Sequence, residues 1–142
     1  MIKTLRILGL ILVITSCNSN EKKTINTAYN QEPTELEASI KRGKIVYNDM
    51  CITCHMAKGE GIPRAFPPLA NSDYLRNNQA ESIKGVKKGM SGEIIVNGVT
   101  YNSMMAPLGL SDDEVADVMN FINNSWGNTI NNFVTPEKVS KL

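Results

Sequence analysis

The chain has 142 residues, which is enough for one domain of ordinary size. Only 6% of the residues are aromatic, so a core must consist mainly of aliphatic side chains or include a cofactor. The formal net charge is +1, and it becomes −1 (13 basic against 14 acidic residues) without residues 1–16, which contain Lys3 and Arg6. This balance gives no support for nucleic-acid binding, which usually needs a basic excess.

Residues 1–16 have the features of an export signal. Lys3 and Arg6 are followed by a short apolar run at residues 7–14, and a membrane-spanning helix would need about 20 apolar residues. Two small residues then lead into Cys17, which resembles the lipobox of bacterial lipoproteins, where this cysteine becomes the acylated first residue after cleavage. The alternative is an ordinary signal peptide followed by a cysteine without a role. A spare thiol in an exported chain favours the lipoprotein.

Residues 17–34 are predicted to be an acylated cysteine followed by a flexible polar tether. The segment is rich in asparagine, lysine, glutamate and threonine, and such a composition cannot bury enough apolar surface to fold. A flexible segment of about 17 residues extends roughly 20–25 Å on average. We therefore expect one folded domain, over residues 35–142, that moves over a membrane surface while it stays attached.

The first predicted helix covers residues 35–50, with Thr34 as its N-cap. Its apolar residues recur at roughly helical spacing; they are Leu36, Ile40, Ile45, Val46 and Tyr47. Gly43 lies four residues before Tyr47, and a glycine on the inward face permits close approach of another helix. The alternative is a mid-helix glycine that only lowers stability, by about 1 kcal/mol.

The run Cys-Ile-Thr-Cys-His at residues 51–55 is the most specific motif of the chain. Two thiols separated by a two-residue spacer can add to the two vinyl groups of a haem, and the adjacent histidine then binds the iron. The motif therefore predicts one covalently attached haem c, held at Cys51 and Cys54 and bound by His55.

Three other interpretations of this motif are weaker. A structural zinc site has four ligands, whereas Cys51, Cys54 and His55 supply three and the only other cysteine is Cys17. A thioredoxin-like redox pair would stand in a βαβ pattern, but a helical pattern precedes this motif and a loop rich in glycine and proline follows it. A disulfide across so short a loop would be strained and would leave His55 without a role.

Three further elements are predicted towards the C-terminus. Residues 79–88 form a helix that ends at Gly89 and carries three lysines, which are either a solvated face or a contact for an acidic partner. Asn97-Gly98 between two short apolar runs is a strong signal for a β-hairpin with a type I′ turn. Ser111 and Glu114 form a capping box at the start of the last helix, whose apolar stripe must pack against an apolar partner; the stripe is Val115, Val118, Met119 and Ile122, with Phe121 at its edge.

These features together resemble the class I cytochromes c, over roughly residues 35–140. The resemblance implies an all-α fold of about four helices around one covalently bound haem, with a short β-hairpin before a methionine ligand loop. It also implies that Val118 and Phe121 of the last helix meet Gly43 and Tyr47 of the first. Four segments resemble small cytochrome c domains beside or fused to exported copper reductases, oxidases and quinoprotein dehydrogenases; they are residues 96–98, 110–112, 125–128 and 135–137.

The resemblance also implies a methionine as the second iron ligand, from a loop just before the last helix. Met105 lies five positions before Leu110, the residue that precedes the capping Ser111, and this spacing in the sequence matches the family pattern. Ala106 separates it from Pro107, whereas the family commonly has proline directly after the methionine, so Met104 stays as an alternative and Met90 as a weaker one. A methionine that does not bind iron would be a gap-filling core residue.

The stretch around Pro67 and Leu69 resembles the family's proline-leucine segment below the haem. There a proline carbonyl accepts the Nδ1–H of the iron-bound histidine, fixes its tautomer and strengthens it as a ligand. The resemblance implies this role for Pro67, which matches better than Pro68, and a haem contact for Leu69. The alternative is a plain loop stiffened by prolines.

Two functions follow from a covalent haem. With histidine and methionine on the iron, no position is open for a substrate, so the chain would be a single-electron carrier and not an enzyme. Its partners would be membrane-bound or periplasmic oxidases, reductases or dehydrogenases, which it would contact through small interfaces. The lipid anchor would hold the chain on a membrane, facing the periplasm, and so raise the local concentration of these partners. The alternative is a haem enzyme or gas-binding sensor with an open or displaceable sixth position.

Overall fold

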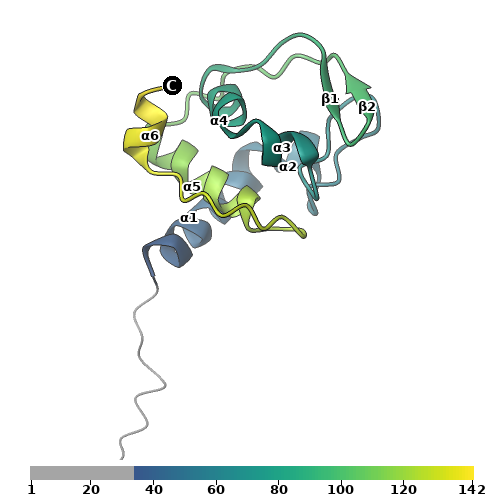
Figure 1. Cartoon of the computed structure of the whole chain (residues 1–142). Helices are drawn as coiled ribbons and strands as arrows, with labels where there is room; N and C mark the ends of the chain where they lie inside the picture. Colours follow the sequence, from purple (N-terminus) through teal and green to yellow (C-terminus); the bar gives the residue numbers. More distant parts are fainter. Residues whose placement is uncertain (1–33) are drawn as a thin grey trace, which may run out of the picture. The chain divides into compact units, whose positions relative to one another are not determined.

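The structure is a computed structural model that describes residues 34–142 (Figure 1). In this part of the chain six helices and one two-stranded antiparallel sheet follow one another. Their bounds are α1 Glu35–Met50, α2 Ile52–His55, α3 Asp73–Asn77, α4 Gln79–Lys88, β1 Ile94–Val96, β2 Val99–Tyr101, α5 Asp112–Asn123 and α6 Pro136–Ser140. The mainly helical fold with a short hairpin is confirmed. About four helices were expected and six are present among the described residues. The sequence could not reveal α2, α3 and α6, because helices of four or five residues are too short to show a helical period.

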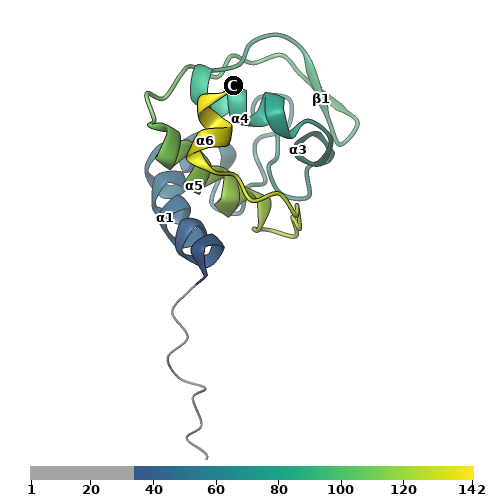
Figure 2. The same ribbon diagram turned by 60° about the vertical axis from the view of Figure 1, so that its left-hand side comes forward.

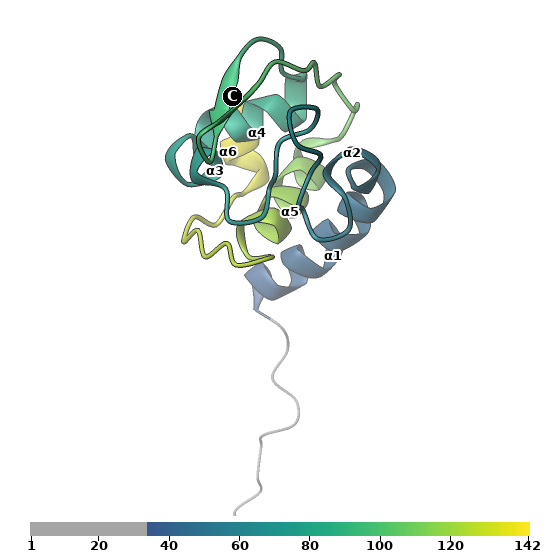
Figure 3. The same cartoon turned by 90° about the vertical axis from the view of Figure 1, so that its right-hand side faces the viewer.

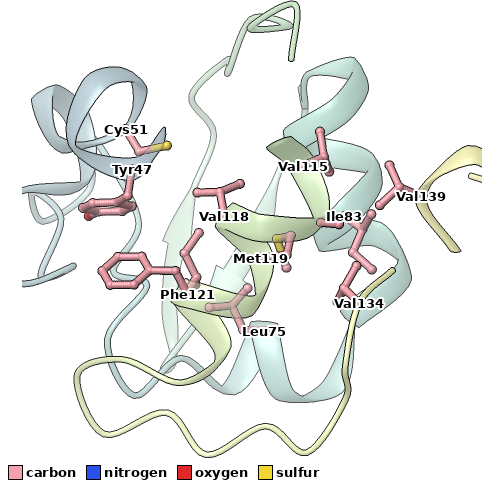
Figure 4. Packing of buried hydrophobic residues seen from close by; sticks show 12 residues of the cluster. Tyr47, Cys51, Leu75, Ile83, Val115, Val118, Met119, Phe121, Val134 and Val139 are labelled. Atoms are coloured by element: carbon pink, nitrogen blue, oxygen red, sulfur yellow. The ribbon is translucent and has the colours of Figure 1, made fainter. Parts of the chain in front are cut away.

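Helix α1 crosses α5 at Gly43, and Figures 1 and 3 show the two helices passing across each other. A Cβ atom at Gly43 would lie 1.9 Å from the Asp117 carbonyl oxygen, so only glycine permits this approach. One helical turn later the rings of Tyr47 and Phe121 pack with centroids 5.4 Å apart, side by side in Figure 4. The predicted meeting of the two helices at these residues is confirmed.

Ile45 belongs to the apolar pattern from which the first helix was predicted, but it does not lie on the buried face of α1. Its side chain is 60% exposed. Successive residues of an α-helix are 100° apart, so a residue two positions from both Gly43 and Tyr47 lies on the opposite side of the helix. Ile45 therefore faces away from α5 and towards solvent, as regular helical geometry requires.

Helix α5 is the central element of the core. The predicted capping box of Ser111 and Glu114 is present, and every residue from Val115 to Asn123 is buried. This burial on all sides arises because α1, α4 and α6 all pack against α5. The apolar core around it is shown in Figure 4 and includes Leu75, Ile83, Val118, Met119, Ile122, Val134 and Val139.

The hairpin has the predicted turn and is fastened to α3. Ile94 pairs with Tyr101 and Val96 with Val99, while Asn97 and Gly98 have φ values of 50° and 77°, as a type I′ turn requires. The Asn97 side-chain oxygen accepts from the Asp73 amide at 3.0 Å, and the Asp73 carboxylate accepts from the Asn97 amide at 2.7 Å. This reciprocal pair fixes the hairpin, and the chain leaves it directly towards Met105.

The C-terminal segment lies against α4 and α5, as Figure 2 shows for α6. Val134 and Val139 are fully buried. The Asn120 side chain donates to the Val134 carbonyl at 2.8 Å and accepts from its amide at 2.9 Å, and the Lys87 ammonium donates to the Val139 carbonyl at 2.9 Å. Among the described residues, no helix is both long and apolar enough to cross a membrane.

Candidate haem site

An apolar cavity of about 280 Å³ lies between the segment that follows α1 and the loop that follows the hairpin. Cys51, Cys54 and His55 line it from the first segment, and Met104 and Met105 line it from the second. A second cavity of about 80 Å³ shares part of this lining and extends it towards α4 and α5. The residues that line both are Cys51, His55, Pro67, Met90, Ile94 and Met105.

Helix α2 directs the motif residues towards the cavity. Cys51 ends α1, where its amide donates to the Tyr47 carbonyl at 2.9 Å, and it begins α2, where its carbonyl accepts from the His55 amide at 3.0 Å. Residues three and four positions apart lie on one face of a helical turn. This is why Cys51, Cys54 and His55 line the same cavity. Cys51 is buried and Cys54 is partly buried.

Burial of Cys51 raises the pKa of its thiol to about 11, and the neighbouring Cys54 contributes in the same direction. Burial also lowers the pKa of His55, against a smaller opposite effect of its bond to Pro67. The imidazole is therefore neutral at pH 7, which is the form that binds a metal.

The Pro67 carbonyl decides the tautomer of His55. His55 Nδ1 lies 3.0 Å from the Pro67 carbonyl oxygen, and because a carbonyl can only accept, the proton must be on Nδ1. Nε2 then carries a free lone pair. The contact between these two residues is the one that the sequence resemblance implies, and Leu69 lines the second cavity.

The loop between His55 and Leu69 depends on two glycines that the sequence analysis did not single out. Gly59 accepts from the Leu69 amide at 2.7 Å, and the Gly61 amide donates to the His55 carbonyl at 3.0 Å. A Cβ at Gly61 would lie 2.7 Å from the Pro67 carbonyl oxygen. Both have positive φ values, 65° and 66°. The only available signal was that two glycines stand two positions apart shortly after the motif.

The three candidate methionine ligands differ in their surroundings. Met104 is 77% exposed and lines only the larger cavity, whereas Met105 and Met90 line both. Met90 and Met105 pair in an antiparallel bridge, with each amide donating to the other's carbonyl at 2.8 Å. Their shared bridge brings two thioether side chains to one region of the cavity wall.

The residues that line the cavity fit a covalently attached haem. Two thiols, one neutral imidazole with a free nitrogen and a thioether from another segment form the donor set, and the remaining lining is mostly apolar. Within residues 34–142, no three His, Cys, Asp or Glu side chains cluster in a way that could hold a bare metal ion. Cys17, the predicted lipid attachment site, lies outside the described residues.

Comparisons with known proteins identify the class. Residues 40–126 match the family model for cytochrome c, and the chain is 38% identical over 101 residues to cytochrome c-552 of Thermus thermophilus, covering 65% of this chain and 77% of that protein. The chain belongs to the cytochrome c family.

Two further relatives are subunits of larger enzymes. The chain is 36% identical over 104 residues to the cytochrome c subunit of the quinone alcohol dehydrogenase of Gluconobacter oxydans, and 31% identical over 104 residues to the gluconate 2-dehydrogenase cytochrome c subunit of Pantoea cypripedii. Each alignment covers 70% of this chain but only 21% and 23% of those subunits. The predictions of covalently bound haem c with iron and of haem-based electron transfer are confirmed at the level of the family.

Proposed function

We propose that Cys51 and Cys54 hold the haem through thioether bonds and that His55 and Met105 bind its iron. In this proposal the protein is a single-electron carrier between exported or membrane-bound redox proteins, and not an enzyme. The observation that carries it is the one apolar cavity that Cys51, Cys54 and His55 line from one segment and Met105 from another, 50 positions further along the chain.

The haem supplies a reversible one-electron couple when it is bound. His55 offers Nε2 to the iron while Nδ1 donates to Pro67, a bond that makes the imidazole a stronger ligand. Met105 supplies a neutral thioether, which raises the reduction potential, and Leu69 contributes to the apolar wall. Because His55 and Met105 would both hold the iron, no position on it would be left for a substrate.

An exposed apolar rim of the cavity supports contact with redox partners. Met104 and Met50 both line the larger cavity, and their side chains are 77% and 43% exposed. Electron-transfer complexes have small, quickly released interfaces. The dehydrogenase subunits among the relatives suggest a dehydrogenase as one such partner; oxidases and reductases of the membrane or periplasm are others.

We further propose export and membrane attachment, with residues 1–16 as a lipoprotein signal peptide, Cys17 acylated, residues 17–34 as a tether and residues 35–142 as the cytochrome domain. The support is the residue pattern before and at Cys17. A tether raises the local concentration of partners in the same membrane.

Replacement of Met105 tests the ligand assignment. In the haem-loaded protein, Met105→Ala should make the iron accessible to carbon monoxide and lower the reduction potential by about 0.1–0.3 V, within the roughly 0.8 V that axial ligands span. Met104→Ala, at an exposed neighbouring position, is the matched control and should change neither, while Met90→Ala tests the second cavity methionine. The measurements are optical spectra with and without carbon monoxide and a potentiometric titration.

Two outcomes would contradict the proposal. If Met105→Ala leaves the spectrum and the potential unchanged while Met90→Ala or Met104→Ala alters them, the ligand is the methionine whose replacement has the effect. Rapid carbon monoxide binding by the native protein would instead favour the haem enzyme or gas sensor, because it would require an open sixth position.

A further inference from the structure

We propose that Asn128 is a positioning residue for His55: it holds the Leu69 carbonyl and thereby fixes the segment whose Pro67 carbonyl orients the imidazole. The inference rests on the proposed binding of iron by His55. It concerns a residue two positions beyond the range that matches the family model, which ends at residue 126.

Asn128 lies in a tight turn after α5. Trp126 and Gly127 both have positive φ values, 51° and 84°, and they turn the chain back so that the Asn128 amide donates to the Ser125 carbonyl at 2.9 Å. The residue is only 3% exposed. Its side-chain Nδ2 donates to the Leu69 carbonyl at 2.7 Å and to the Ile122 carbonyl at 2.9 Å. One side chain therefore joins the end of α5 to the segment below the cavity.

The Leu69 position is transmitted to the Pro67 carbonyl with little freedom. The Leu69 amide donates to Gly59, and its carbonyl accepts from Asn128, so both polar groups of this residue are held. Residues 67 and 68 are prolines, whose rings fix φ near −65°. Few backbone rotations are therefore left to absorb a shift of the Leu69 carbonyl before it reaches the Pro67 carbonyl, which lies 3.0 Å from His55 Nδ1.

A second contact from the same turn supports this function. The Trp126 ring packs on Gly59, where a Cβ would lie only 2.6 Å from the ring. Gly59 is the residue whose carbonyl accepts from the Leu69 and Ala70 amides. The turn after α5 thus holds the segment directly through Asn128 and indirectly through Gly59.

The polar chemistry at position 128 requires an amide. Two carbonyl oxygens face the side chain, and only an NH₂ group can donate to both. The other end, Oδ1, is buried and has no hydrogen-bond partner, which is a free-energy cost. An aspartate of the same shape would place a carboxylate against two carbonyl oxygens. The two hydrogen bonds that Nδ2 donates are thus made even though Oδ1 of the same side chain accepts none.

Asn120 provides a matched control for an experiment. It is also buried, and its Nδ2 also donates twice, to the Ser39 hydroxyl at 2.9 Å and to the Val134 carbonyl at 2.8 Å. Its partners belong to α1 and the C-terminal segment and not to the segment below the cavity. A loss of packing and hydrogen bonds at Asn120 should therefore reduce stability without disturbing His55.

The experiment compares Asn128→Ala and Asn120→Ala in the haem-loaded protein. Three quantities are measured: denaturant stability, the ratio of reduced to oxidised protein at a fixed ambient potential, and the rate at which the His55 ring N–H exchanges with deuterium, followed by NMR. Asn128→Asp is a second, isosteric variant. If it does not accumulate, the alanine variant still decides the question.

Both alanine variants should lose stability, but only Asn128→Ala should change the other two quantities. A weaker bond to Pro67 makes His55 a poorer donor to oxidised iron, so the reduced-to-oxidised ratio should rise about threefold, which is about 28 mV at 59 mV per tenfold change. The ring N–H should exchange several times faster.

The inference is overturned if Asn128→Ala changes stability alone, as Asn120→Ala does, or if both variants shift the ratio equally. These results differ from a failure of the proposed iron ligation. In that case the native protein itself would lack a haem-shifted His55 ring N–H signal, and no comparison of variants would be needed to see it.

Discussion

Tyr47 joins the first helix to the segment that follows the haem motif. Its side chain is 1% exposed, and its hydroxyl donates to the Met56 carbonyl at 2.7 Å. Burial raises the pKa of this phenol well above its ordinary value of 10, and the Glu60 carboxylate adds to the shift. The folded protein therefore keeps Tyr47 neutral at a pH where the unfolded chain loses the proton.

Tyr47→Phe should lower the stability at pH 7 by about 1 kcal/mol, because the Met56 carbonyl loses its donor. Below pH 10 the phenol is neutral in both states, so its ionisation affects stability only above that pH. There the native protein should lose up to about 1.4 kcal/mol of stability per pH unit, and Tyr47→Phe should lack this contribution. Denaturant unfolding at pH 8 and pH 11 measures both effects. An identical alkaline loss in the two proteins would show that Tyr47 ionisation is not its source.

Ser103 connects the two loops that carry candidate haem contacts. Its hydroxyl donates to the Ala65 carbonyl, and Ser103 itself lines the larger cavity. Ala65 lies two positions before Pro67, and Ser103 lies two positions before Met105. This hydrogen bond ties the methionine side of the cavity to the histidine side.

Ser103→Ala should accelerate the displacement of Met105 by added imidazole about twofold to tenfold, because a net hydrogen bond is worth about 0.5–1.5 kcal/mol. Stopped-flow spectroscopy of the oxidised protein measures the rate. Asn102→Ala, at an exposed position next to it, should leave the rate unchanged. Equal rates in the native protein and the Ser103 variant would mean that the loops do not move apart during ligand exchange.

At the scale of elements, the long helices and the hairpin could be predicted because their signals are local. Thr34 with Glu37 and Ser111 with Glu114 form capping boxes between residues three positions apart, and the Asn97-Gly98 turn depends on two adjacent residues. The short helices lack such signals. In α5 the stripe predicted one buried face, whereas the structure buries all sides of the helix from Val115 onwards, because three other helices cover it.

Gly43→Ala should lower the free energy of unfolding by about 1–3 kcal/mol, although alanine favours a helix over glycine by about 1 kcal/mol. The added Cβ would lie 1.9 Å from the Asp117 carbonyl oxygen, so α1 and α5 must move apart. Denaturant unfolding measures the change. Asn48→Ala is exposed on the same helix and should change stability by less than about 0.5 kcal/mol. A stable Gly43→Ala protein would mean that the crossing tolerates a wider separation.

At the scale of the whole molecule, a polar network that runs from an exposed arginine into the core ties the C-terminal segment to the first helix. The Arg42 guanidinium makes two hydrogen bonds to the Asp117 carboxylate, at 2.6 and 2.7 Å, and the Ser39 hydroxyl donates to the same carboxylate at 2.7 Å. Asn120 continues the network from Ser39 to Val134. The network thereby joins α1, α5 and the segment beyond the family match into one unit.

Cys17→Ser should move the haem-loaded protein from the membrane fraction to the soluble fraction without a change in its optical spectrum. The reason is that a serine cannot carry the proposed thioether-linked lipid, whereas the haem would be attached at other residues. Cell fractionation followed by haem staining measures the distribution. Asn18→Ser is the control for a polar change in the same segment. A Cys17→Ser protein that stays in the membrane fraction would contradict the proposed anchor.

The sequence by itself was sufficient for the haem motif, the capped helices and the hairpin turn, since each is defined by residues a few positions apart. Only the tertiary structure decided which methionines line both cavities, that Ile45 faces solvent, and that Asn128 holds Leu69, 59 positions away in the sequence. Contacts of that kind leave no periodic pattern in the chain. They arise when separate segments pack together, and a single asparagine or methionine looks the same in the sequence whether it lies in solvent or against the cavity wall.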